Sequence, residues 1–183
     1  MKQDKKQIYS WAFYDWANSA YSTTVMAGFF PIFFEKFYSN PNDVIQSTYQ
    51  LGLANSISSI FIALVPPLLG AIADRGSAKK KLLIIFAFLG SLMTAALWLV
   101  QKGDWQLAVF FYIIATIGFM AGNIFYDSLL PSVAGREKVD YVSALGYSLG
   151  YLGGGLLFLI NVLMYLYPQW FGIPDSSTAI RIS

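Results

Sequence analysis

Four polar side chains that could bind a solute or carry a proton lie inside an apolar stretch near the start of the chain. The run from about Ile8 to Phe34 is long enough to cross a bilayer, and it contains Asp15, Asn18, Ser19 and Ser22. Placing an aspartate in the middle of a membrane helix costs about 2.5–3.5 kcal/mol on insertion scales. Acidic residues inside membrane spans mark functional sites by default, so we interpret Asp15 as the centre of one.

These four side chains share one face of the predicted helix. They fall within an arc of about 100° when successive residues are rotated by 100°. Met26 continues this polar stripe, whereas Thr24 is predicted to lie on the opposite face.

A second polar stripe occurs farther along the chain, where Thr116, Met120, Asn123 and Asp127 share a narrow helical face. Asp15 and Asp127 lie at depths that differ by about one helical turn from the same side of the membrane. This similarity predicts that the two stripes line a shared water-filled cavity. The alternative is that both acids are interfacial residues, Asp15 being favoured by the positive end of its helix.

The composition identifies a membrane protein. Of the 183 residues, 56% are hydrophobic and only 12% are charged, about half the charged fraction of a soluble domain. The sequence contains neither Cys nor His, so thiolate nucleophiles and histidine or cysteine metal sites are excluded. We predict no cofactor, no metal site, no enzymatic activity and no nucleic-acid partner.

The hydrophobic residues form blocks of about 20, which is the length of a membrane span. We predict an all-α polytopic protein with five spans and the start of a sixth near Asp175. Because the chain stops at Ser183 before that helix could span, we expect it to be a fragment of a longer protein. The predicted spans are about 8–34, 49–73, 82–100, 107–130 and 141–167.

The basic residues fix the predicted orientation. The leader holds three basic residues, the loop after the second span four and the loop after the fourth span two, which makes nine on one side of the membrane. The opposite side holds three. The positive-inside rule therefore places the N-terminus in the cytoplasm.

Glycines in the fifth span predict close helix packing. Gly146, Gly150 and Gly154 recur every four residues and would let a neighbouring helix approach along one face. No strand precedes them, so they are not a nucleotide-binding fingerprint.

The loop after the second span carries a further pattern, in which Gly70 is followed by Asp74, Arg75, Gly76 and then three lysines. It resembles the loop between the second and third helices of the major facilitator superfamily. The resemblance implies that Gly70, Asp74 and Arg75 set the conformation of the transporter and do not contact substrate. The alternative is a generic positively charged hairpin.

Three segments resemble the vacuolar-effluxer-like, autophagy-related branch of that superfamily. They are Tyr14-Asp-Trp-Ala-Asn-Ser-Ala-Tyr21, Asn123-Ile-Phe-Tyr-Asp-Ser-Leu-Leu-Pro131 and Ser143-Ala-Leu-Gly-Tyr147. The resemblance implies a facilitator-type fold of about twelve helices, in which the first and fourth line a central cavity. This chain would be most of the N-terminal half of such a bundle, with the C-terminal half absent from it. The resemblance also implies transport of amino acids, in the plasma membrane if the protein is bacterial or in the vacuolar membrane if it is fungal. The two acids in apolar spans make protons a candidate coupling ion. The fourth span departs from the wider superfamily because it has no arginine at its polar positions.

We therefore predict a secondary active transporter of a small polar solute that works by alternating access. Asp15 would be the principal cavity group, with Asn18, Ser19 and Ser22 beside it. Asp127, assisted by Asn123, would be a second acid. The alternative is a non-transporting membrane scaffold or receptor, in which the polar faces only hold helices together.

Overall fold

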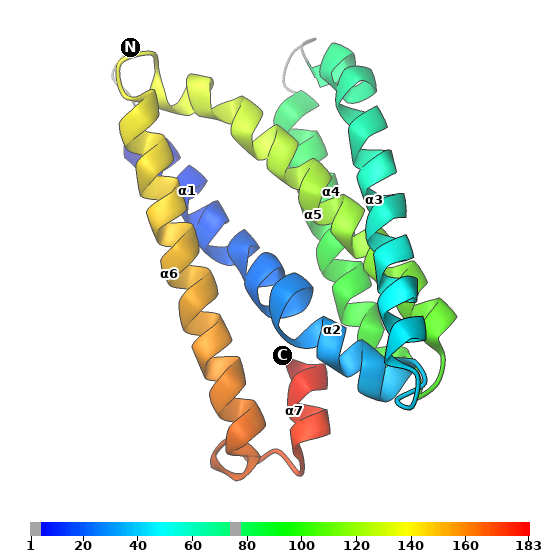
Figure 1. Ribbon diagram of the computed structural model, residues 1–183. Coiled ribbons are helices and arrows are strands. Elements are labelled where there is room, and N and C mark those ends of the chain that lie inside the picture. The colour runs from blue at the N-terminus through cyan, green and yellow to red at the C-terminus, as the bar shows by residue number, and fades with distance from the viewer. Residues whose placement is uncertain (1–4, 74–77) are drawn as a thin grey trace. The chain divides into compact units, whose positions relative to one another are not determined.

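The computed structural model describes residues 5–73 and 78–183 (Figure 1). For residues 65–73 it describes the backbone alone. The described residues form helices joined by short turns, with no β-strand among them. The predicted all-α class is therefore confirmed for this part of the chain.

The N-terminal helical segment changes its hydrogen-bonding pattern along its length. It begins as α1 (Lys5–Ala20) and continues as a π-helical stretch (Tyr21–Phe29), the short α2 (Phe30–Phe33) and a second π-helical stretch (Phe34–Tyr38). The backbone N–H of Phe30 donates to the carbonyl of Val25, five residues earlier, which is the π-helical pattern.

The remaining helices are mostly long. They are α3 (Val44–Ala73), α4 (Ala78–Ala96) with a 3-10 turn (Leu97–Leu99), α5 (Trp105–Ala134), α6 (Val139–Leu166), a second 3-10 turn (Pro168–Phe171) and α7 (Ser176–Ile182). α5 runs through Pro131 to Ala134, past the predicted end of its span at Leu130.

The chain divides into two compact units. The first comprises Met1–Ile32 with Leu130–Ser183, and the second comprises Phe33–Leu129. In the first unit α1 lies along α6, and α7 packs back onto α6 (Figure 1). The Asp175 carboxylate caps α7 by accepting a hydrogen bond of 2.8 Å from the backbone N–H of Thr178.

The second unit contains α3, α4 and most of α5. Gly90 of α4 and Gly118 of α5 bring two backbones together, because a Cβ on Gly118 would lie only 2.6 Å from the backbone nitrogen of Gly90. The rings of Phe86 and Phe125 stack beside this contact, with centroids 5.8 Å apart. The buried hydroxyl of Tyr38 donates to the carbonyl of Leu97.

Three helices among the described residues are long and apolar enough to cross a membrane. They are Ala78–Leu99, Trp105–Ala134 and Val139–Leu166. Many of their large apolar side chains are exposed, Phe88 and Leu92 of α4 among them, as expected for helices that face lipid. The count of five spans and the start of a sixth stays a prediction.

Candidate functional site

Asp15 lies where α1 meets α6 in the first unit. The hydroxyl of Ser19, one turn farther along α1, donates to Asp15 Oδ1 at 3.3 Å. A Cβ placed on Gly150 of α6 would lie 2.8 Å from Asp15 Oδ2 and 2.7 Å from Ser19 Oγ. The carboxylate and the hydroxyl therefore occupy the space that a side chain at position 150 would take.

The glycines of α6 make this close approach possible. One edge of α6 carries four buried glycines, Gly146, Gly150, Gly153 and Gly154. Because glycine has no side chain, neighbouring atoms can approach the backbone of α6 along this edge. A Cβ on Gly153 would lie 2.5 Å from the carbonyl oxygen of Trp16. The face is specific, because a Cβ on the next residue, Gly155, would meet no atom within 4 Å.

Asn18 and Ser22 form hydrogen bonds within the N-terminal segment itself. The hydroxyl of Tyr14 donates to Asn18 Oδ1 at 3.4 Å. The hydroxyl of Ser22 donates to the carbonyl of Ser19 at 2.9 Å. Asp15 and Ser19 thus lie at the helix crossing, whereas Asn18 and Ser22 are held by neighbours in their own segment.

The π-helical stretch (Tyr21–Phe29) changes the direction in which the side chains after Ala20 point. A π-helical turn holds more residues than an α-helical turn, so the 100° spacing used for the predicted stripe does not continue through Ser22 to Met26. Thr24, predicted on the opposite face, is instead 2% exposed. Its hydroxyl oxygen accepts a hydrogen bond of 3.4 Å from Asn161 Nδ2 of α6.

Asn161 is a polar contact that the sequence analysis missed. It is buried and lies inside a helix apolar enough to span a membrane. The signal was present in the sequence, because an amide in an apolar span needs a hydrogen-bonding partner just as a carboxylate does.

The predicted residues of the fourth span belong to the second unit. Asp127 is exposed and Asn123 is partly exposed, while Thr116 on the same face is buried. The cavity predicted between these residues and Asp15 stays a prediction. One turn before Thr116, the buried Tyr112 hydroxyl donates to Asn55 Oδ1 of α3 at 3.0 Å.

Of the predicted gating residues, Gly70 lies near the end of the α3 backbone. Asp74 and Arg75 lie outside the described residues. Across residues 5–73 and 78–183, no group of three acidic, His or Cys side chains could hold a metal ion.

The Asp15–Ser19 pair can bind a cationic group or take up a proton. An ionised carboxylate has about four acceptor positions, and the hydroxyl of Ser19 is directed at one oxygen. Cation binding and proton uptake are therefore within the chemistry of this pair.

Comparison with known proteins identifies one matching family model, described as "Vacuole effluxer Atg22 like", over residues 44–140. The chain is 39% identical to the uncharacterized MFS-type transporter YxiO of Bacillus subtilis over 180 residues, which cover 98% of this chain and 42% of that protein. It is 31% identical to an uncharacterized protein of Aquifex aeolicus over 163 residues, which cover 87% of this chain and 40% of that protein.

A fungal relative is more distant. Autophagy-related protein 22 of Neurospora crassa is 30% identical over 92 residues, which cover 50% of this chain and 12% of the fungal protein. The chain spans about two fifths of the length of the two bacterial relatives. No solved structure matches it.

Proposed function

This chain belongs to the family of vacuole effluxer Atg22-like proteins, and we propose that it forms part of a secondary active transporter of the major facilitator type. The solute would be small and polar, with amino acids as the substrate class. The name of the Bacillus subtilis relative, an MFS-type transporter, supports this reading. Such transporters bind solute near the middle of the bilayer and rock two halves around the site.

The observation that carries the proposal is the position of Asp15. Its carboxylate lies in an apolar segment, where charge is costly, and it fits against α6 only because residue 150 is glycine. Helix packing alone would be satisfied by an apolar side chain at this crossing. In our proposal Asp15 and Ser19 bind the ammonium group of the solute or a coupled proton, and Asn18 and Ser22 add neutral hydrogen-bonding groups.

The rest of the proposal follows the facilitator plan. Asp127, with Asn123, would be a second acid on the solute or proton path. Gly70, Asp74 and Arg75, in and before the loop after α3, would gate the transporter by setting its conformation. The protein would have five spans and the start of a sixth in its N-terminal half, with the N-terminus in the cytoplasm, and a second half would complete the cavity.

Counterflow of radiolabelled amino acids into liposomes tests this function, using the complete coding sequence that contains these residues. Asp15→Asn keeps the shape of the side chain and removes its charge, so it should abolish transport or remove its pH dependence. Asp104→Asn is the matched control, because Asp104 is exposed in the turn before α5. Transport by Asp15→Asn with an unchanged pH profile would refute the role of Asp15. Absence of counterflow for every amino acid would favour a scaffold or receptor.

A further inference from the structure

Between Thr48 and Ile60 the exposed side chains of α3 separate into a polar face and an apolar face, whereas Ile45, outside that range, is exposed on the side of the polar face. Leu53, Ile60 and Leu64 are 48%, 61% and 61% exposed, and at 100° per residue they fall within about 40° of one another. The polar face of α3 occupies a separate arc of about 100° between residues 48 and 59, with no apolar side chain inside it. Its exposed members are Thr48, Gly52, Asn55, Ser56 and Ser59.

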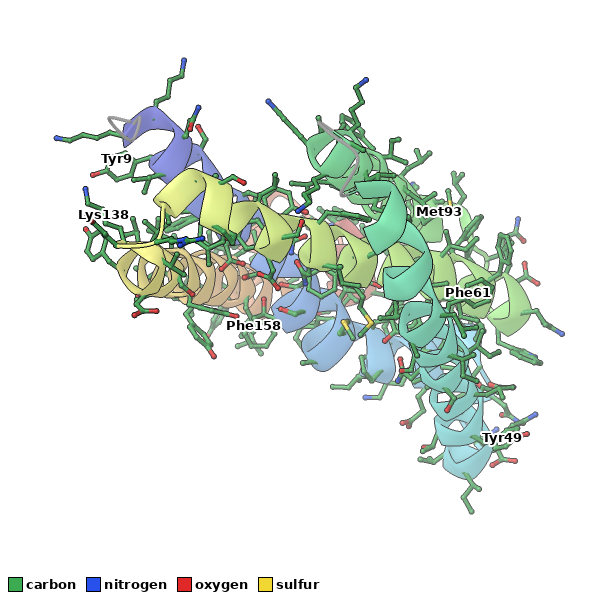
Figure 2. The ribbon with its side chains drawn as sticks, turned by 90° about the horizontal axis from the view of Figure 1, so that it is seen from above. Tyr9, Tyr49, Phe61, Met93, Lys138 and Phe158 are labelled. Atoms are coloured by element: carbon green, nitrogen blue, oxygen red, sulfur yellow. The ribbon has the colours of Figure 1, made fainter. Side chains whose placement is uncertain are left out.

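Lipid can cover the apolar face, but the polar face needs another environment. Figure 2 shows side chains projecting from the part of α3 that includes the labelled Tyr49 and Phe61. The hydroxyls of Thr48 and Ser56 donate to carbonyls of their own helix, each at 2.8 Å, so neither requires an external acceptor. Asn55 is different, because a side-chain amide has two donors and an acceptor to satisfy.

Only the oxygen of the Asn55 amide is held. Asn55 Oδ1 accepts a hydrogen bond of 3.0 Å from the hydroxyl of Tyr112. The Tyr112 residue is 2% exposed. The side chain of Thr116 hydrogen-bonds Tyr112 in turn. The tyrosine hydroxyl has only one proton to donate, and Tyr112 donates it to Asn55. In the hydrogen bond between Tyr112 and Thr116, Thr116 must therefore be the donor. The exposed Asn55 side chain therefore uses its oxygen in this network, and its two amide N–H donors take no part in it.

Helix–helix adhesion alone does not account for this arrangement. Such adhesion would bury both partners, as it does for Thr24 and Asn161, which are 2% and 3% exposed. Asn55 is exposed, and among the described residues its side chain forms no hydrogen bond besides that to Tyr112. It lies about three turns into α3, which begins at Val44, and its amide donors would be left unsatisfied in hydrocarbon.

We propose that Asn55 lines the water-filled path of the transporter and that its amide N–H groups bind a carboxylate oxygen of the solute. Tyr112 and Thr116 are positioning residues that fix the orientation of the amide. Tyr112 also extends the polar face of α5 that contains Asn123 and Asp127. The assignment of a ligand rests on the proposed transport function, whereas the assignment of Asn55 to an aqueous surface does not.

Cysteine labelling tests the aqueous surface without any transport measurement. The chain contains no Cys, so Asn55→Cys and Leu53→Cys each introduce one thiol into this part of the protein. The two positions are separated by two residues, about 3 Å along the helix axis, and differ in face. In membranes, a charged methanethiosulfonate reagent should label residue 55 at least about tenfold faster than residue 53, after subtraction of the parent protein. Equal, slow labelling at both positions would overturn the proposal.

Substrate kinetics test the ligand. Asn55→Asp keeps an acceptor for the Tyr112 hydroxyl but replaces the amide nitrogen with a carboxylate oxygen, which makes the side chain anionic. We expect KM for radiolabelled L-amino acids in counterflow to rise at least about tenfold, with kcat within about twofold. Tyr112→Phe should raise KM by a smaller factor, because the amide remains but loses its anchor. Ser56→Ala, which removes a hydroxyl bonded to its own helix, is the matched control and should leave KM unchanged.

Competition with amino-acid carboxamides completes the test. Asn55→Asp should weaken competition by free amino acids much more than competition by their carboxamides, which lack the anionic group. Equal weakening of both, or a KM within about twofold of the parent value, would overturn the ligand assigned to Asn55. A parent protein that transports no amino acid would instead refute the proposed function, and the labelling result would still decide whether Asn55 faces water.

Discussion

Gly150→Ala should displace the Asp15 carboxylate while leaving the helix pair folded. The added Cβ would lie 2.8 Å from Asp15 Oδ2 and 2.7 Å from Ser19 Oγ, against 3.4–4 Å for an ordinary contact. Both atoms are at the ends of side chains and can rotate away without moving the backbone of α1. The carboxylate would then leave the position that we propose for solute or proton binding.

The stability change expected for Gly150→Ala can be compared with the changes expected for alanine at Gly153 and Gly155. Overpacking costs about 1–3 kcal/mol, while alanine gains about 0.5–1 kcal/mol over glycine inside a helix. Because side-chain ends can move, Gly150→Ala should cost between about zero and 1 kcal/mol in net stability. Gly153→Ala would meet the carbonyl oxygen of Trp16 at 2.5 Å, so it should cost about 2 kcal/mol net. Gly155→Ala meets nothing within 4 Å and should be neutral or slightly stabilising.

Thermal unfolding in detergent and amino-acid counterflow in liposomes, measured on all three variants, separate stability from transport. Gly153→Ala should lower the midpoint of unfolding, and Gly155→Ala should match the parent in both assays. Gly150→Ala should unfold near the parent midpoint but lose most of its transport. The reasoning fails if Gly150→Ala transports as well as Gly155→Ala, or if it unfolds as early as Gly153→Ala.

Two further predictions concern packing and capping. Gly118→Ala would place a Cβ 2.6 Å from the backbone nitrogen of Gly90, so thermal unfolding should show a loss of about 3 kcal/mol, whereas Gly52→Ala, with nothing within 4 Å, should show none. The Thr178 backbone hydrogen bond lowers the pKa of Asp175 below its ordinary value of 3.8. Since the folded-state pKa is depressed, the cap stabilises α7 above the unfolded-state pKa and is lost as the pH falls through the folded-state pKa. Hydrogen exchange at the Thr178 amide should therefore lose its protection below pH 3.8, and pH-independent protection would contradict this.

The helical class and the polar groups of α1 could be predicted because they depend on local sequence. Blocks of apolar residues predict helices, and an aspartate inside such a block is conspicuous on its own. The predicted packing glycines rest on a simple repeat. A Cβ on Gly150 would clash with side chains of α1, and a Cβ on Gly154 would make a tight contact of 3.1 Å with the carbonyl oxygen of Ser19. The sequence did not predict that Asp15 and Gly150 meet, because residues far apart in the chain meet only once the helices pack.

The π-helical stretch after Ala20 could not be predicted from periodicity. A spacing of 100° per residue assumes one helix type throughout, and a change of helix type shifts every later side chain around the axis. This is why the stripe predicted from Asp15 does not continue regularly to Met26. The residues of the stretch, which include Thr23 and Gly28, carry no pattern that distinguishes a π-helix from an α-helix.

Asn161 and Asn55 show why residue type alone does not separate packing from a binding site in a membrane protein. Both are asparagines in helices rich in apolar residues, and each forms one interhelical side-chain hydrogen bond, to Thr24 and from Tyr112 respectively. Asn161 is buried, and one N–H of its amide donates to Thr24 inside the protein. Asn55 uses only its oxygen and is exposed, so its donors are left for water or a ligand. Burial and the direction of the hydrogen bond therefore assign Asn161 to the helix contact and Asn55 to the solute path.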